Sequence, residues 1–218
     1  MHRTPHSSFT VAGLLGLLLT GCVDAYNTNR ITDPEASYSG DGFVANVPPG
    51  KYWRLIHHQR GRLTMGKLIP GVENSSDHTL VVSVETYWVD RNPHSKLLDA
   101  RTGEEFLAAL KRDIPAMFDA SPRSTLLSLK LSPHGEPGSF CAREEVVQEE
   151  HDYSVNPEQV FTITARGFQC LDASRQFTVL ASYRERKPKE SVSIIDVRLA
   201  KDGEAFLKGV VVNPYRGK

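Results

Sequence analysis

The sequence predicts an α+β domain, in which a mostly antiparallel β-sheet packs against two helices at about residues 103–119 and 202–210. Segments with alternating apolar and polar residues recur between residues 43 and 186, as in strands with one buried face. Phe106, Leu110, Ile114 and Phe118 repeat at a spacing of four, which is typical of an amphipathic helix. Strands dominate and only two helices interrupt them, which favours a sheet backed by helices.

The N-terminus has the layout of a secretory signal. Residues 1–8 carry Arg3 and no acidic residue, and residues 9–19 form an uncharged, mostly apolar run. This run is shorter than the roughly 20 residues that a membrane-spanning helix needs. It ends in Leu19-Thr20-Gly21-Cys22, which resembles the lipobox of bacterial lipoproteins: an aliphatic residue, two small residues and a cysteine.

The lipobox resemblance implies a cleaved signal peptide over residues 1–21 and lipidation of Cys22. In that family the thiol receives a diacylglycerol and the new amine usually receives a third acyl chain. Aspartate directly after the cysteine tends to retain such proteins in the inner membrane, and here that position is Val23. The resemblance therefore implies a protein of the bacterial envelope, anchored in the outer membrane and facing the periplasm. The alternative is an ordinary signal with a chance cysteine.

The remaining chain divides into a tether and one domain. Residues 22–41, the lipidated N-terminus and the segment after it, are polar and predict a flexible tether. A coil of about 19 residues would span roughly 24 Å. Residues 42–218 are long enough for one sizeable core, so we expect a single domain. Removing residues 1–21 leaves 25 basic and 26 acidic residues, a balance that does not suggest nucleic acid as a partner.

The elements of the domain follow in order. Alternation predicts strands over residues 43–47, 51–58, 62–69, 78–89, 124–131, 141–153, 160–170 and 176–186. Thr102 and Glu105 form a capping-box pattern that begins the first helix, and Pro115 is expected to kink or break it. Residues 191–199 are ambiguous, and residues 202–210 predict the closing helix.

Cys141 and Cys170 are expected to form a structural disulfide. A turn through Asn156-Pro157 centres a hairpin in which paired positions sum to 311, as these two cysteines do. Directly opposed residues of an antiparallel pair lie within disulfide range. A redox-active pair is the alternative, but no Cys-x-x-Cys motif supports it.

The order of elements resembles the Mog1/PsbP-type fold. The resemblance rests on the pattern F-x-V-x-x-P-x-G-x-Y-W from Phe43, the run of strands, helix and strands, and the closing AFLKGV segment. It covers residues 42–211. It implies an adaptor or accessory subunit, because members of this fold are often not enzymes, and it assigns no functional residue.

The most unusual charged stretch is KYWRLIHHQRGRLTMGK, at residues 51–67. It contains Arg54, Arg60, Arg62 and Lys67 with no acidic residue, beside an aromatic pair. Basic and aromatic residues together suit an anionic lipid head group, an acidic glycan or an acidic protein surface. The alternative is a solvated face that balances the acidic hairpin at residues 144–152, with Trp53 in the core.

Motifs for chemistry are weak. Gly61-x-x-x-x-Gly66-Lys67 lacks the Ser or Thr of a phosphate loop, so we expect no nucleotide. His57 and His58 would point to opposite faces of a strand, so we expect no metal site and no cofactor. The carboxylates of REEVVQEEHD, from Arg143, could serve acid–base chemistry but fit a solvated face better.

The sequence therefore predicts a lipid-anchored, non-catalytic protein that holds an envelope protein partner near the membrane. The alternatives are an envelope hydrolase or cell-wall-modifying enzyme with a dispersed site, and a small-ligand carrier. A cleft with a perturbed histidine or carboxylate would favour the enzyme. A flat apolar or charged face would favour the adaptor, and an enclosed apolar pocket the carrier.

Overall fold

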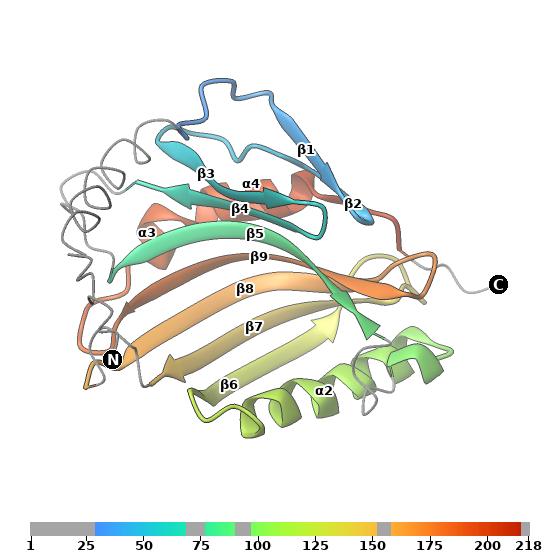
Figure 1. Ribbon diagram of the computed structural model, residues 1–218. Coiled ribbons are helices and arrows are strands. Elements are labelled where there is room, and N and C mark those ends of the chain that lie inside the picture. The colour runs from blue at the N-terminus through green and yellow to red at the C-terminus, as the bar shows by residue number, and fades with distance from the viewer. Residues whose placement is uncertain (1–28, 69–76, 90–96, 152–157, 215–218) are drawn as a thin grey trace, which may run out of the picture.

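The computed structural model describes residues 29–68, 77–89, 97–151 and 158–214 (Figure 1). The predicted order of strands, helix, strands and closing helix is confirmed within them. The elements are β1 (Ser37–Gly40), β2 (Phe43–Asn46), β3 (Trp53–Gln59), β4 (Arg62–Lys67), β5 (Thr79–Trp88), η2 (Leu97–Asp99), α2 (Gly103–Asp119), β6 (Ser124–Pro133), β7 (Cys141–Glu150), β8 (Phe161–Leu171), β9 (Phe177–Pro188), α3 (Ile195–Arg198), α4 (Ala200–Gly209) and β10 (Val211–Val212).

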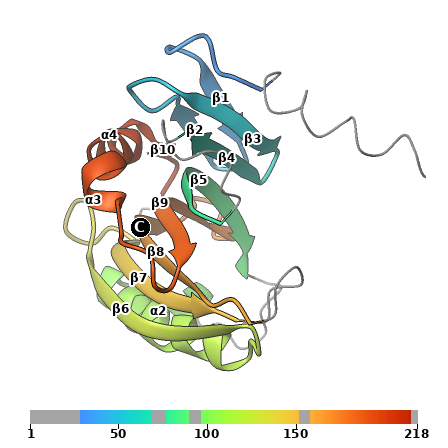
Figure 2. The ribbon, with the colours of Figure 1, turned by 90° about the vertical axis from the view of Figure 1, so that its left-hand side faces the viewer.

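Seven strands form one antiparallel sheet, in the order β3-β4-β5-β9-β8-β7-β6. A small sheet, β1-β2-β10, lies beside β3 and β4. The seven-stranded sheet is strongly curved, and helices α2 and α4 lie on either side of it (Figure 2). The predicted α+β class, with a mostly antiparallel sheet, is confirmed.

Each face of the large sheet carries its own core. On β5, Leu80, Val82 and Val84 join a core with α3, α4 and the small sheet. The alternate residues of β5, such as Ser83 and Glu85, therefore lie on the opposite face. We call this opposite face the open face. Helix α2 packs onto its β6–β7 end through a second core.

The second core belongs to helix α2, which begins as the sequence predicts. The backbone N–H of Glu105 donates to Thr102 Oγ1 at 3.2 Å, and Glu105 Oε2 accepts from the N–H of Arg101 at 2.6 Å. Phe106 and Leu110 are buried against the sheet. The predicted break at Pro115 does not occur, because proline removes only one helical hydrogen bond near the end of a helix that otherwise packs well.

The hairpin register is confirmed at every predicted pair. Cys141 lies opposite Cys170, and Glu145 lies opposite Arg166. The two cysteines are joined by a disulfide, with their Cα atoms 4.1 Å apart. The predicted turn through residues 156 and 157 lies outside the described residues. The bond links two neighbouring strands inside the sheet and holds their register.

The predicted tether is too long at its C-terminal end. Residues 37–40 form β1, which pairs with β2, and Tyr38 packs against the first core. Residues 29–31 bond to β3: the N–H of Ile31 donates to Trp53 O at 3.1 Å, and the N–H of Leu55 donates to Asn29 O at 2.9 Å. The side chains of β1 are mostly polar, so hydrophobic alternation does not predict a strand there. β1 is a strand because β2 supplies its hydrogen bonds. The ordered domain therefore begins by residue 29, before the predicted boundary at 42.

Close backbone approaches shape the open face. A Cβ atom on Gly167 of β8 would lie 2.1 Å from the carbonyl oxygen of Ala181 on β9. Only glycine therefore permits this approach of the two strands.

Within the described residues, no helix combines the length and apolarity needed to cross a bilayer.

Candidate functional site

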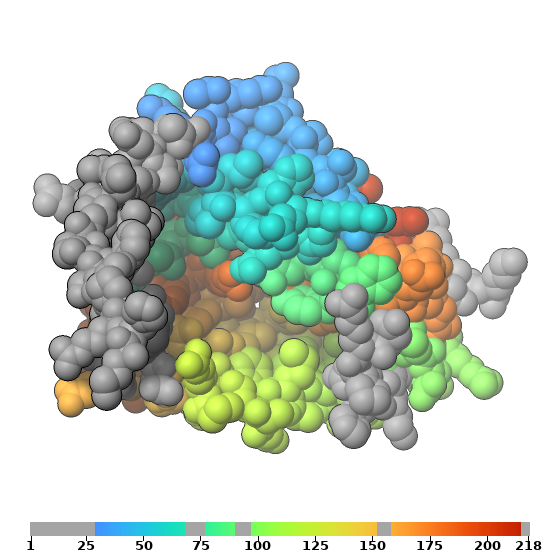
Figure 3. Space-filling model, viewed as in Figure 1, coloured from blue at the N-terminus to red at the C-terminus, as the bar shows by residue number. Residues whose placement is uncertain are grey.

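A row of small polar residues crosses the open face. Each member lies directly opposite the next on the neighbouring strand. From β4 through β5, β9 and β8 to β7, the row consists of Thr64, Ser83, Ser182, Gly167 and Glu144. The four with side chains are buried, and the hydroxyls of Ser83 and Ser182 lie 3.3 Å apart. Figure 3 shows the molecule hollowed between the β4–β5 strands and helix α2. Buried polar side chains therefore line up across five neighbouring strands of the sheet.

Glu144 is the charged member of this row. Its residue surface is only 6% exposed. Within the described part of the chain its carboxyl forms no hydrogen bond or ion pair. Burial raises the pKa of this carboxyl to about 7. Near neutral pH both the protonated and the ionised form of this carboxyl are therefore populated. The protonated form can donate a proton, and the ionised form can accept one.

A second charged group on the open face is centred on Glu85, which we call the Glu85 cluster. Tyr87 Oη donates to Glu85 Oε2 at 3.1 Å. Glu85 Oε1 lies 3.8 Å from Arg184 Nη1 and 3.9 Å from Arg62 Nη2. Partial burial raises the pKa of the Tyr87 phenol above its usual range, and the negative charge of Glu85 is the second largest cause of this increase. One carboxylate thus holds an aromatic ring and two guanidinium groups, all partly exposed.

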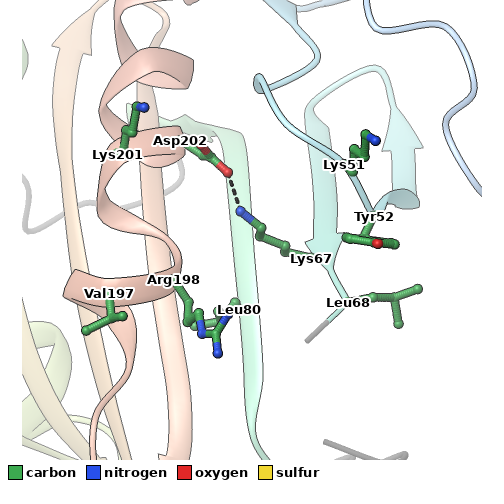
Figure 4. A pocket seen from close by; sticks show the side chains of 9 residues that line it. All are labelled: Lys51, Tyr52, Lys67, Leu68, Leu80, Val197, Arg198, Lys201 and Asp202. Atoms are coloured by element: carbon green, nitrogen blue, oxygen red, sulfur yellow. Dashed lines mark hydrogen bonds and ion pairs between the residues drawn. The ribbon is translucent and has the colours of Figure 1, made fainter. Parts of the chain in front are cut away.

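A different surface lies where the β2–β3 loop meets α3 and α4, and we call it the basic surface. It contains two hollows of about 330 and 370 Å³ that share Lys51 and Tyr52. Figure 4 shows Lys51, Tyr52 and Leu68 on one side of the first hollow and the α3–α4 residues on the other. The polar and aromatic residues that define the basic surface are Arg30, Lys51, Tyr52, Arg198 and Lys201, with the apolar Val197 among them.

The floor of the first hollow is an ion pair between Lys67 of β4 and Asp202 of α4. The ammonium of Lys67 also lies 5.4 Å from the ring centre of Trp53. Gly50, with a φ of 93°, brings the loop so close that a Cβ there would lie 3.1 Å from an Asp202 oxygen. Since Asp202 is already paired, it does not neutralise the surrounding cations.

Tyr52 holds an unusual backbone conformation at the centre of the basic surface. Its φ is 72°, in the left-handed region that bulky residues rarely adopt. The loop is held by the Trp53 indole N–H, which donates to Pro49 O at 3.0 Å, and by the N–H of Leu68, which donates to Tyr52 O at 3.0 Å. The ring itself remains 45% exposed. The loop therefore displays an aromatic side chain at a conformational cost.

The four predicted contact residues do not form one patch. Arg54 and Arg62 lie on the open face, since Arg54 pairs with Gly66 and Arg62 with Glu85. Arg60 lies in the β3–β4 turn and forms an ion pair with Asp41 at 2.7 Å. Lys67 points to the α4 face and pairs with Asp202. The structure therefore does not bring these four residues together on one surface, and their contact with an anionic partner stays a prediction.

The alternative prediction for this stretch is partly correct. Trp53 is buried in the first core, as that alternative expects. Three of the four cations pair with acidic residues outside the hairpin at residues 144–152: Arg60 with Asp41, Arg62 with Glu85 and Lys67 with Asp202.

Other predicted positions are placed as follows. Cys22 lies outside the described residues, so its lipidation stays a prediction. His57 and His58 pair with Thr64 and Leu63 and so point to opposite faces. No group of three potential metal ligands occurs among the residues the structure describes. Residues 61–67, the partial phosphate-loop match, form the end of a tight turn and strand β4.

A carboxylate, a histidine and a serine meet at Glu185, but not in the order of a catalytic triad. His78 Nε2 lies 2.7 Å from Glu185 Oε1, and Ser193 Oγ donates to the other carboxylate oxygen. The N–H of Ile194 donates to Glu185 as well, at 2.8 Å. In a catalytic triad the serine hydroxyl is hydrogen-bonded to the histidine, whereas here it donates to the carboxylate. This cluster instead fixes the segment before α3 to β9.

Sequence reasoning missed Arg198 and Lys201, and it did not connect Arg30 with Lys51. These residues come from distant parts of the chain, and only the tertiary fold brings them to one surface. Arg198 ends α3 and Lys201 lies at the start of α4, both outside the predicted helix at residues 202–210, so no local pattern connected them.

This chain resembles known proteins only in the arrangement of its helices and strands. No family model matches the chain, and no curated protein matches it significantly in sequence. Similar solved structures include LpqN of Mycobacterium tuberculosis, described as involved in cell envelope biogenesis, with a TM-score of 0.41, 13% identity, and 85% of this chain and 88% of LpqN covered. The Ran-binding protein Mog1p of Saccharomyces cerevisiae gives a TM-score of 0.40 and 10% identity over 79% and 91% of the two chains.

A third similar structure is the cyanobacterial PsbP of Synechocystis, with a TM-score of 0.37 and 13% identity over 81% and 91% of the two chains. Mog1 and PsbP, the two proteins that the element order resembles, are thus both among the similar structures. Because each TM-score is below 0.5, we transfer no residue and no activity from them.

Proposed function

We propose that this protein is a lipid-anchored, non-catalytic accessory protein of the bacterial envelope. Cys22 carries its acyl chains, the outer membrane holds it, and its domain faces the periplasm. There it acts as an adaptor that keeps a protein partner near the membrane. The lipobox at residues 19–22 supports the anchor, and the open face supports the binding of a partner.

The observation that carries the adaptor is the Glu85 cluster. Tyrosine and arginine contribute most often to the energy of protein–protein interfaces, because they combine a large contact area with directed hydrogen bonds. Tyr87 is 42% exposed, and Glu85 fixes its hydroxyl before any partner arrives. Arg62 and Arg184 exceed Glu85 by one positive charge. The cluster therefore suits an acidic segment of a protein partner, with an apolar residue placed on the Tyr87 ring.

In-cell photo-crosslinking tests this proposal. A photoreactive phenylalanine replaces Tyr87 in one strain and Val211 in another, since Val211 is also exposed but lies on the small sheet. Captured proteins are identified by mass spectrometry. We expect a defined envelope protein from position 87 and none from position 211. The Arg62→Gln/Arg184→Gln variant should reduce capture at Tyr87 by about fivefold.

The Cys22→Ser variant tests the anchor separately. It should lose acyl labelling and, with it, most capture of the partner. Equal capture from positions 87 and 211 would contradict the open face as the binding surface. Continued acyl labelling of the Cys22→Ser variant would contradict the lipobox interpretation.

One observation favours the enzyme as a second candidate. A buried carboxyl with a pKa near neutrality suits a general acid or base, and Glu144 meets that description. A hydrolase using Glu144 should lose at least about 100-fold in rate in the Glu144→Gln variant. Wild-type turnover of cell-wall fragments that this variant abolishes would replace the adaptor with the enzyme.

A further inference from the structure

The ordered domain begins close to the predicted anchor. Only residues 23–28 separate Cys22 from Asn29, the first residue that the structure describes, whose carbonyl oxygen accepts a hydrogen bond from Leu55 of β3. Even a fully extended chain of that length reaches at most about 25 Å. Arg30, the next residue, lines the hollow that also contains Lys51 and Tyr52. The chain therefore enters the domain at the basic surface.

The basic surface carries cations that nothing in the described chain neutralises. Lys51, Arg198 and Lys201 form no ion pair within the described residues, and Asp202 is taken by Lys67. Three positive charges thus surround a hollow of about 330 Å³. A group that fits there must be small at its charged end and anionic. A phospholipid phosphate meets both conditions.

Exposed apolar groups lie among these cations. Val197 is 83% exposed and Tyr52 is 45% exposed, although both line the first hollow. Cations together with a tyrosine and an aliphatic side chain are the composition of a surface that rests at a lipid–water boundary. The left-handed conformation of Tyr52 keeps its ring in this position. A turn alone would favour glycine or asparagine there.

We propose that the basic surface binds anionic phospholipid head groups of the membrane in which the protein is anchored. The proposal rests on the proposed lipid anchor, because the short connection brings this surface against the bilayer. Lys51, Arg198 and Lys201 contact lipid phosphates, and Tyr52 and Val197 enter the boundary between head groups and acyl chains. The domain is thereby attached at two places and held in one orientation.

Vesicle binding by the unacylated protein tests this surface without the anchor. The Cys22→Ser chain lacking residues 1–21 is mixed with vesicles of phosphatidylglycerol and phosphatidylcholine, or of phosphatidylcholine alone, and sedimented. We expect binding to the anionic vesicles only, and weakening as salt rises. The Lys51→Gln/Arg198→Gln/Lys201→Gln variant should bind at least tenfold more weakly. The Tyr52→Asn variant should bind about threefold more weakly.

The control variant is Lys111→Gln/Arg123→Gln/Lys208→Gln, which removes three exposed, unpaired cations elsewhere in the described chain. It should lose less than about twofold. Equal losses in the two triple variants would overturn the proposal, since they would show attraction by overall charge. Absence of binding to anionic vesicles, or binding of inorganic phosphate without binding of vesicles, would also overturn it. Acyl labelling of the complete chain tests the lipid anchor independently of vesicle binding. Failure of the lipid anchor and failure of the basic surface to bind lipid can therefore be told apart.

Discussion

The pH dependence of stability tests the burial of Glu144. Burial raises the pKa of its carboxyl from 4.5 to about 7. A carboxyl with a raised folded-state pKa stabilises the fold fully below the unfolded-state value of 4.5. That contribution is lost as the pH rises through about 7, because the buried group must ionise. The difference corresponds to about 3 kcal/mol, at 1.36 kcal/mol per pH unit.

The Glu144→Gln variant keeps the shape of the protonated side chain but cannot ionise. Its free energy of unfolding is compared with that of the wild type by urea denaturation at about pH 4 and about pH 8. The variant should gain about 3 kcal/mol on the wild type between these two conditions. The Glu136→Gln variant, at an exposed position, serves as the control and should show no such gain. A difference between Glu144→Gln and wild type that is the same at both pH values would refute the reasoning.

Three further changes test other features. Replacing Cys141 and Cys170 by serine should lower the free energy of unfolding by about 3.5 kcal/mol through loop-closure entropy, measured by denaturation of the oxidised wild type and the variant; an unchanged midpoint would contradict a stabilising bond. Gly167→Ala should cost at least about 2 kcal/mol, because its Cβ would meet Ala181 O at 2.1 Å, and a thermal midpoint equal to wild type would show that β8 and β9 can separate. Tyr52→Asn should raise stability by about 1 kcal/mol, since asparagine tolerates a positive φ, and a loss of stability would contradict strain at this position.

Local patterns explain why so much of the fold could be predicted. Alternation along β5 is clear because Leu80, Val82 and Val84 all enter one core. The first helix was predicted at residues 103–119, its observed bounds, because Thr102 and Glu105 carry a capping signal in the sequence itself. The disulfide followed from hairpin symmetry alone, which needs only the position of the turn.

Features that depend on distant contacts could not be predicted. β1 has few apolar residues and becomes a strand because β2 supplies its hydrogen bonds. The basic surface joins residues 30 and 51 to residues 198 and 201, which no local pattern connects. Glu144 reads as part of a solvated acidic strand. Its burial depends on its place in a polar row that only the order of the strands reveals.

The pairing of residues 29–31 with β3 also has a mechanical consequence. In the proposed arrangement, with an anchored N-terminus and a bound protein partner, force between the two enters the domain at this edge. The first bonds to carry it are those from Ile31 to Trp53 and from Leu55 to Asn29. The disulfide joins β8 and β7, which lie three and four strands beyond β4 in the sheet order. Under load the domain should therefore separate from its β3 edge and lengthen the proposed connection to the membrane, while the covalently linked strands β7 and β8 stay in register.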